Sequence, residues 1–182
     1  MMRIALVPGA LALSSRYRSL DDPLADLRTA VDAALDWVGP DPRVVGDAHG
    51  VVADLLEVRN PERGEEATEG VVIVANGSAR RSEKAPGHFD ERALVFDDWL
   101  REALTVDPAE LAHLDHALAA ELWADVAALP VLADLLDGPK PADFAPAETD
   151  HGPQRPKVRL IGMDYDADPF GVKYWVIRWE VL

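Results

Sequence analysis

The stretch GVVIVA at residues 70–75 constrains the fold more than any other part of the sequence. It contains four consecutive β-branched residues and no polar side chain. β-branched residues favour strands, and an unbroken apolar run is typical of a strand that is covered on both faces of its sheet. Because helices are the usual cover for a central strand of this kind, the run predicts an α/β fold.

Hydrophobic periodicity predicts the other elements of the chain. Alternating or continuous apolar runs predict strands at residues 3–7, 43–45, 157–162 and 172–181. Apolar positions three and four residues apart predict helices at residues 21–38, 91–104 and 108–136, with Pro130 kinking or splitting the last of these. Residues 51–58 fit either a strand or a short helix. This order predicts a single three-layer domain, residues 1–182, with a mixed central sheet.

Composition narrows the functional classes. A chain of 182 residues with 48% hydrophobic residues can bury a sizeable core without disulfides or a structural metal. It has no cysteine, which excludes disulfides, Cys-ligated zinc, iron–sulfur clusters and a Cys nucleophile. Its formal net charge of −15 repels phosphate backbones, so nucleic acid is not an expected partner.

Two segments bear on targeting and on loop structure. Pro8 and Gly9 interrupt the apolar N-terminal stretch, so it does not resemble a signal peptide, and no apolar run reaches the ~20 residues of a membrane span. We therefore expect a cytoplasmic protein with no membrane partner. Residues 138–156 hold five of the fourteen prolines and are expected to form a loop. The sequence does not decide whether this loop closes over a site as a lid.

The strongest candidate site follows the strand expected at residues 70–75, because open α/β sheets place sites where strands end. The following NGSARRSEKAPGHFD brings three basic residues into five positions of an acidic chain. Cations beside a hydroxyl and backbone N–H groups suit a carboxylate or phosphate. The alternative is that the cations pair with neighbouring acids such as Glu83, Asp90 and Glu91. The expected ligand-binding residues are Asn76, Ser78, Arg80, Arg81, Lys84 and His88.

The histidines offer a second kind of site. His49 follows a short expected strand, a suitable place for a metal ligand, although a structural role is the alternative. His113 and His116 lie one turn apart on an expected helix and could share a metal, or could simply be solvated on its polar flank. The sequence contains no GxGxxG, Walker A, GxSxG or HExxH motif.

Residues 76–104, together with the closing DYDADPFGVKYWVIRW, resemble the bacterial LigB-like family of class III extradiol ring-cleavage dioxygenases. The broader family has a strand ending in Pro-His, a second ending in Pro-His-Gly, and a later Gly-Asp-x-Ser-His-Arg motif. The counterparts here are Pro8-Gly9, Ala48-His49-Gly50, and the six residues from Ala75 to Arg80.

The resemblance implies a LigB-like fold and a changed site. In members of this family two histidines and a carboxylate hold Fe(II), while another histidine moves the proton. Here the first metal histidine corresponds to Gly9 and the proton-moving histidine to Ala79, which leaves His49 as the expected metal residue. The resemblance therefore implies a protein that has lost extradiol activity, needs no cofactor, and retains an anion-tolerant crevice for a small acidic metabolite or partner.

Two alternatives stay open, and with them the question whether the protein is an enzyme. One is an active dioxygenase-type oxidoreductase that uses Fe(II) or another divalent metal, with His49 and His88 as ligands. The other is an interaction module, in which the face with Trp175 and Trp179, or the helix expected at residues 108–136, packs on a second copy in a homo-oligomer.

Overall fold

A five-stranded mixed sheet runs through the computed structural model, which describes residues 1–14, 22–59, 69–137 and 157–182. Its strands are β1 (Met2–Val7), β2 (Arg43–Val45), β3 (Glu69–Val74), β4 (Val158–Ala167) and β5 (Tyr174–Val181), in the order β2-β3-β1-β5-β4. β1, β2 and β3 are parallel, whereas β5 is antiparallel to both β1 and β4. The sheet edge at which β1, β2 and β3 end is called the carboxyl edge below.

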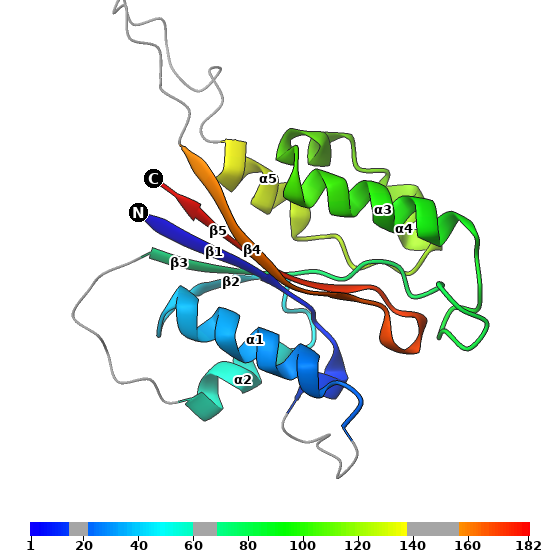
Figure 1. Cartoon of the computed structure of the whole chain (residues 1–182), viewed down its shortest axis with the longest axis horizontal. Coiled ribbons are helices and arrows are strands. Elements are labelled where there is room, and N and C mark those ends of the chain that lie inside the picture. Colours follow the sequence, from blue (N-terminus) through cyan, green and yellow to red (C-terminus); the bar gives the residue numbers. More distant parts are fainter. Residues whose placement is uncertain (15–21, 60–68, 138–156) are drawn as a thin grey trace, which may run out of the picture.

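Helices cover both faces of the sheet, which confirms the predicted α/β character (Figure 1). One face carries α1 (Ala25–Val38) and α2 (Val51–Arg59), so the undecided residues 51–58 form a helix. The other face carries α3 (Arg92–Thr105), the 3-10 helix η3 (Pro108–His113), α4 (His116–Glu121) and α5 (Leu129–Asp137). Two further 3-10 turns are η1 (Leu11–Leu13) and η5 (Pro169–Gly171).

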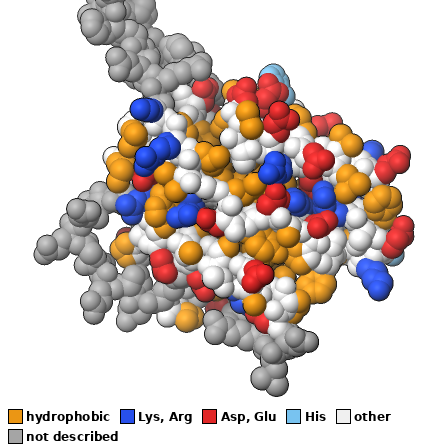
Figure 2. Space-filling view, viewed as in Figure 1, with side chains coloured by type: hydrophobic (Ala, Val, Ile, Leu, Met, Phe, Trp, Pro, Cys, Tyr) orange, Lys and Arg blue, Asp and Glu red, His pale blue; other side chains and the backbone are white. Residues whose placement is uncertain are grey.

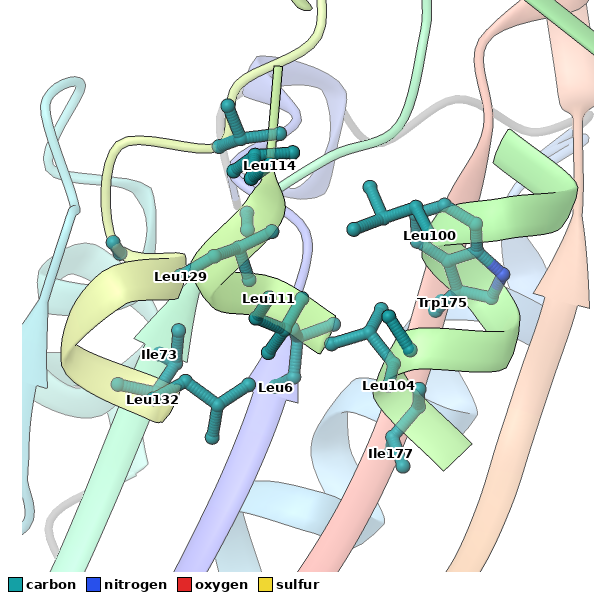
Figure 3. Close-up of a cluster of buried hydrophobic side chains, with 14 of the residues drawn as sticks. Leu6, Ile73, Leu100, Leu104, Leu111, Leu114, Leu129, Leu132, Trp175 and Ile177 are labelled. Atoms are coloured by element: carbon teal, nitrogen blue, oxygen red, sulfur yellow. The ribbon is translucent and has the colours of Figure 1, made fainter. Parts of the chain in front are cut away.

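The core confirms the double coverage predicted for residues 70–75. Val71 and Ile73 of β3 pack against the α3–α5 face, whereas Val72 and Val74 pack against the α1–α2 face. Figure 3 shows Ile73 beside Leu132 of α5, whereas the labelled leucines of α3 lie beside Trp175 of β5. Because a buried strand with apolar side chains on both faces needs two apolar layers, it fixes the three-layer arrangement.

The single helix expected over residues 108–136 is wrong. The segment divides into η3, α4 and α5. Asp107 caps the start of η3 by accepting a hydrogen bond from Ala109 N, and Asp115 starts a new helix, α4, by accepting one from Leu118 N. Trp123 then takes a left-handed conformation (φ 57°) just after Leu122, the C-terminal cap of α4. Pro130 does not split a helix; it lies in the first turn of α5, where a missing N–H is tolerated.

The structure also changes two expectations about possible binding sites. His113 ends η3 and His116 begins α4, so they do not share one helix face, and both are exposed. Trp175 and Trp179 are each 1% exposed and belong to the core beneath α3 and α5. Their face of the sheet is therefore already covered by the chain itself and is not available to a second copy.

The remaining differences concern element bounds. β4 extends to Ala167, well beyond the strand end expected at residue 162, because its antiparallel partner β5 continues to pair with it. Residues 138–156, expected to form a proline-rich loop, lie outside the described residues. Among the helices that the structure describes, none combines the length and apolar character needed to cross a membrane.

Candidate functional site

Asn76 ties together the ends of β1 and β3 at the carboxyl edge. Its side-chain Oδ1 accepts a hydrogen bond of 3.1 Å from Gly9 N, just beyond the end of β1. A Cβ atom at position 9 would lie 2.9 Å from Cγ1 of Val74, which is tighter than ordinary side-chain contacts. The position that the LigB-like resemblance assigns to a metal histidine therefore has no donor side chain and little room for one.

Asp97 of α3 lies beneath the start of residues 76–90, which are called the basic segment below. Its carboxylate accepts hydrogen bonds from Ser78 N (2.8 Å), Ser78 Oγ (2.6 Å) and Arg81 Nη1 (3.0 Å). Asp97 and Ser78 are both 0% exposed. Burial raises the pKa of the Asp97 carboxyl, and the bonds from Ser78 and Arg81 oppose that rise. Ser78, Arg81 and Asp97, called the inner frame below, are thus bound to one another.

Arg81 also fastens the basic segment to the hairpin that joins β4 and β5. Its Nε donates to Asp168 Oδ2 at 2.8 Å, and its backbone N donates to Gly171 O at 3.1 Å. Burial lowers the pKa of Arg81, but its hydrogen bonds to Asp168 and Asp97 raise it overall. Gly171 has φ 73°, and a Cβ there would lie 2.7 Å from Cβ of Ala85, so glycine is required for this close approach.

Arg80 is bound from the opposite side of the basic segment, although its Nε is buried and has no hydrogen-bond partner among the described residues. Its Nη1 donates to the carbonyl of Glu121 at 3.0 Å and lies 3.7 Å from Oδ2 of Asp90. Asp90 also binds Arg92, whose hydrogen bonds are the main reason that the pKa of Asp90 falls to about 2. Figure 2 shows the same tendency over one face, where basic side chains are interspersed with acidic ones. Both arginines are therefore engaged by acids of the same chain.

The partner of Arg80 was among the acids expected from the sequence, whereas the partners of Arg81 were missed. Asp97 carries a sequence signal in hindsight. It lies four residues after Ala93 and three before Leu100, on the apolar stripe of α3. A carboxylate at such a position is buried and needs hydrogen-bond donors. Asp168 lies in the β4–β5 hairpin, far along the chain, and carries no comparable signal.

Backbone hydrogen bonds hold the rest of the basic segment. Ala79, 8% exposed, donates from its N to Leu122 O and accepts at its O from Gly87 N, each at 3.0 Å. Residues 82–88 are called the outer turn below. They include Lys84 and His88, which are both exposed. His88 takes the left-handed conformation (φ 58°), and no ion pair between described residues involves Lys84. These two side chains are the most exposed of the expected ligand-binding set.

His49 is exposed in the turn between β2 and α2. The neighbouring Asp47 is used by the fold, because its two carboxylate oxygens accept hydrogen bonds from Val51 N (2.8 Å) and Ala53 N (2.9 Å) at the start of α2. The outer turn with His88 lies against the β4–β5 hairpin, whereas β2 forms the opposite border of the sheet. The structure therefore does not bring His49 and His88 together.

The carboxyl edge does not fit the Fe(II) ligand set that the resemblance implies. Two histidines and a carboxylate are required, but Gly9 offers no donor and Asp47 is occupied as a helix cap. Within the described ranges, no three His, Cys, Asp or Glu side chains are grouped closely enough to hold a metal ion. We therefore assign no metal-dependent step to this edge.

No protein-family model matches the sequence, and a comparison with curated proteins gives no match. The LigB-like resemblance consequently remains a prediction that depends on the motifs quoted above.

Proposed function

We propose that this chain is a LigB-like protein without ring-cleavage activity, and that it binds a small acidic ligand through the outer turn. The loss of activity is supported by Gly9 and Ala79, which stand where the resemblance expects a metal histidine and a proton-moving histidine. Neither has a side chain that can bind a metal or transfer a proton. A Cβ at position 9 is crowded by Val74, and Ala79 is buried.

The observation that carries the binding role is an exposed cation on a rigid turn of an acidic protein. Lys84 is exposed and forms no ion pair with another described residue, in a chain whose net charge is −15. Its turn is fixed by the bonds Gly87 N to Ala79 O and Asp90 N to Arg80 O, each 3.0 Å. A fixed turn loses little conformational entropy when a ligand binds.

The conformation of His88 gives further support. A non-glycine residue in the left-handed region costs roughly 1–3 kcal/mol, and such residues cluster at functional sites. His88 is held there by the bond from its N to Ala85 O at 3.0 Å. In this proposal, the Lys84 ammonium and the His88 ring donate to the oxygens of a carboxylate or phosphate, while the inner frame holds the turn in place. Because both groups are exposed, binding is weak and salt-dependent.

A phosphate titration tests the binding role. Inorganic phosphate is added to the native chain and to the double variant Lys84→Ala/His88→Asn, with amide signals followed by NMR. Asparagine is chosen because it tolerates the left-handed conformation. We expect saturable shifts in residues 82–88 of the native chain and none in the double variant. The matched control is Lys157→Ala, which removes an exposed lysine at the start of the C-terminal hairpin and should leave the shifts unchanged. Equal phosphate shifts in the native chain and the double variant would overturn the proposal.

A separate assay tests the loss of activity. The protein is loaded with Fe(II) without oxygen, mixed with catechol and oxygen, and oxygen consumption is recorded. We expect the same rate as Fe(II) in buffer alone. Protein-dependent consumption with appearance of a ring-fission product would show that the chain is an active dioxygenase.

A further inference from the structure

A hollow of about 600 Å³ lies on the helical layer, between the first half of α3 and the η3–α4 segment. It is called the helical groove below. Its floor is apolar and consists of Val95, Phe96, Trp99 and Leu118. Pockets that bind small organic molecules have volumes of roughly 300–1,000 Å³ and are mostly apolar with a few polar groups. The helical groove has this size and this character.

Part of this apolar floor is open to solvent. Whereas Trp99 and Leu118 are partly buried and Phe96 is buried, Val95 of α3 is 72% exposed. The rings of Phe96 and Trp99 lie beside it with centroids 6.5 Å apart and tilted by 38°. A single exposed apolar side chain is ordinary, but here it borders a concave pocket that two aromatic rings also line, which is the usual setting of a site for an organic ligand.

The rim of the helical groove consists of two acids, one arginine and one histidine: Glu91, Asp115, Arg92 and His113. Arg92 is neutralised by Asp90 and Glu121, each 2.8 Å from its guanidinium nitrogens. Glu91 makes neither an ion pair with a described residue nor a side-chain capping bond. Asp115 uses one oxygen to cap α4 and forms no ion pair with a described cation. These two carboxylates have the sign of the whole chain and attract cations.

We propose that the helical groove binds a small organic cation with an apolar body, such as an arylalkylamine. The body packs on Val95, Phe96 and Trp99, and the ammonium group lies near the carboxylates of Glu91 and Asp115. The indole face of Trp99 adds an attraction for cations. An anion of the same shape is repelled by the same carboxylates. This inference does not rest on the proposed function, because it uses neither Lys84 nor His88.

Three matched probes test the charge requirement: phenethylamine, phenethyl alcohol and phenylacetate. Binding is followed by NMR through the indole N–H signal of Trp99, which is identified with Trp99→Phe. At low salt we expect phenethylamine to bind about threefold to fivefold more tightly than the alcohol, in line with the strength of exposed ion pairs. We expect phenylacetate to bind most weakly.

Variants test the residues. Glu91→Gln/Asp115→Asn removes both rim charges, and asparagine preserves the cap of α4. This variant should bind the amine no more tightly than the alcohol. The control Asp98→Asn/Glu102→Gln removes two exposed acids of α3 that do not line the groove and should keep the native preference. Val95→Lys places a cation on the floor and should reduce amine binding at least tenfold.

Each contrary result overturns the proposal. These results are equal or tighter binding of phenylacetate, an unchanged amine preference in Glu91→Gln/Asp115→Asn, or no saturable shift at Trp99 with any probe. The side chains substituted in these variants are exposed, so we expect every variant to fold. An unfolding curve for each variant verifies that it does.

Discussion

Charged side chains have opposite roles in the basic segment and in the helical groove. In the basic segment, Arg80, Arg81 and Ser78 are turned toward acids and carbonyls of the same chain, and Asp97 is completely buried. In the groove, Glu91 and Asp115 line the same hollow as the exposed Val95 and the partly buried Trp99, and they form no ion pair with any described residue. The residues that suggest chemistry in the sequence mostly support the fold, whereas a surface without a motif keeps its capacity to bind.

The two regions differ because one is enclosed by several elements of the fold and the other faces solvent. At residues 76–81 the end of β3 meets the β4–β5 hairpin, α3 and the segment after α4, through backbone bonds such as Gly77 N to Lys173 O and Asn76 N to Asp125 O. Most polar groups enclosed by so many elements are hydrogen-bonded within the protein. The groove lies on the outer side of the helical layer, where water satisfies the carboxylates.

Loss of Asp97 should give the largest effect on stability. Asp97→Ala removes one of the two carboxylate partners of Arg81 and leaves the buried hydroxyl of Ser78 without its acceptor, so we expect a loss of about 3–5 kcal/mol in the free energy of unfolding. Urea unfolding measures it. Asp98→Ala, at an exposed position next along α3, should cost less than about 0.5 kcal/mol. Similar losses in both variants would show that the inner frame does not stabilise the fold.

A methyl group at position 77 should have the next largest effect. A Cβ there would lie 2.7 Å from Asp97 Oδ1 and from Cβ of Lys173, so Gly77→Ala should cost about 1–3 kcal/mol through overpacking. Gly162→Ala is the matched control, because its nearest contact would be 3.7 Å away. We expect less than about 0.5 kcal/mol for the control, measured by the same unfolding curves. If Gly77→Ala is as stable as the control, residues 76–81 are not tightly packed.

The pH dependence of stability tests the outer part of the basic segment. Hydrogen bonds from Arg92 lower the pKa of Asp90 from 3.8 to about 2 in the folded chain. The unfolded chain therefore binds this proton more readily, and the contribution of Asp90 is present above pH 4 and lost as the pH falls from about 4 to about 2. Asp90→Asn should flatten this part of the curve of unfolding free energy against pH. An unchanged slope would contradict the ion pairs of Asp90.

The smallest effect should come from the groove. Val95 is 72% exposed, so Val95→Lys should change the free energy of unfolding by less than about 0.5 kcal/mol. The same urea curves measure this. A loss above about 2 kcal/mol would mean that the fold depends on this side chain, and that the groove is not a free surface.

The sequence predicts the layers of this fold well, because they depend on local patterns. The β-branched run at residues 70–75 indicates a strand covered on both faces, and the structure confirms the α/β character with a mixed sheet. The expected helix over residues 108–136 fails because its apolar spacing continues across the Asp115 cap and across Trp123, whose backbone is left-handed. Periodicity reports which side chains are buried, but it does not show where a helix is interrupted.

The site is less predictable, because its contacts join residues far apart in the chain. Arg81 meets Asp168 across 87 positions, and no spacing rule indicates that pair. The sequence does not predict the helical groove, for a related reason. It exists because η3 and α4 are separate and turn against α3, an arrangement that the expected continuous helix does not have.

One NMR experiment compares the two regions directly. The amide signals of the native chain are followed during separate titrations with inorganic phosphate and with phenethylamine. We expect phosphate to shift residues 82–88 and phenethylamine to shift residues 91–99 and 113–118, while Ser78 and Asp97 respond to neither. Saturable shifts centred on Ser78 and Asp97 would contradict this account, because they would show that the inner frame is itself a binding site.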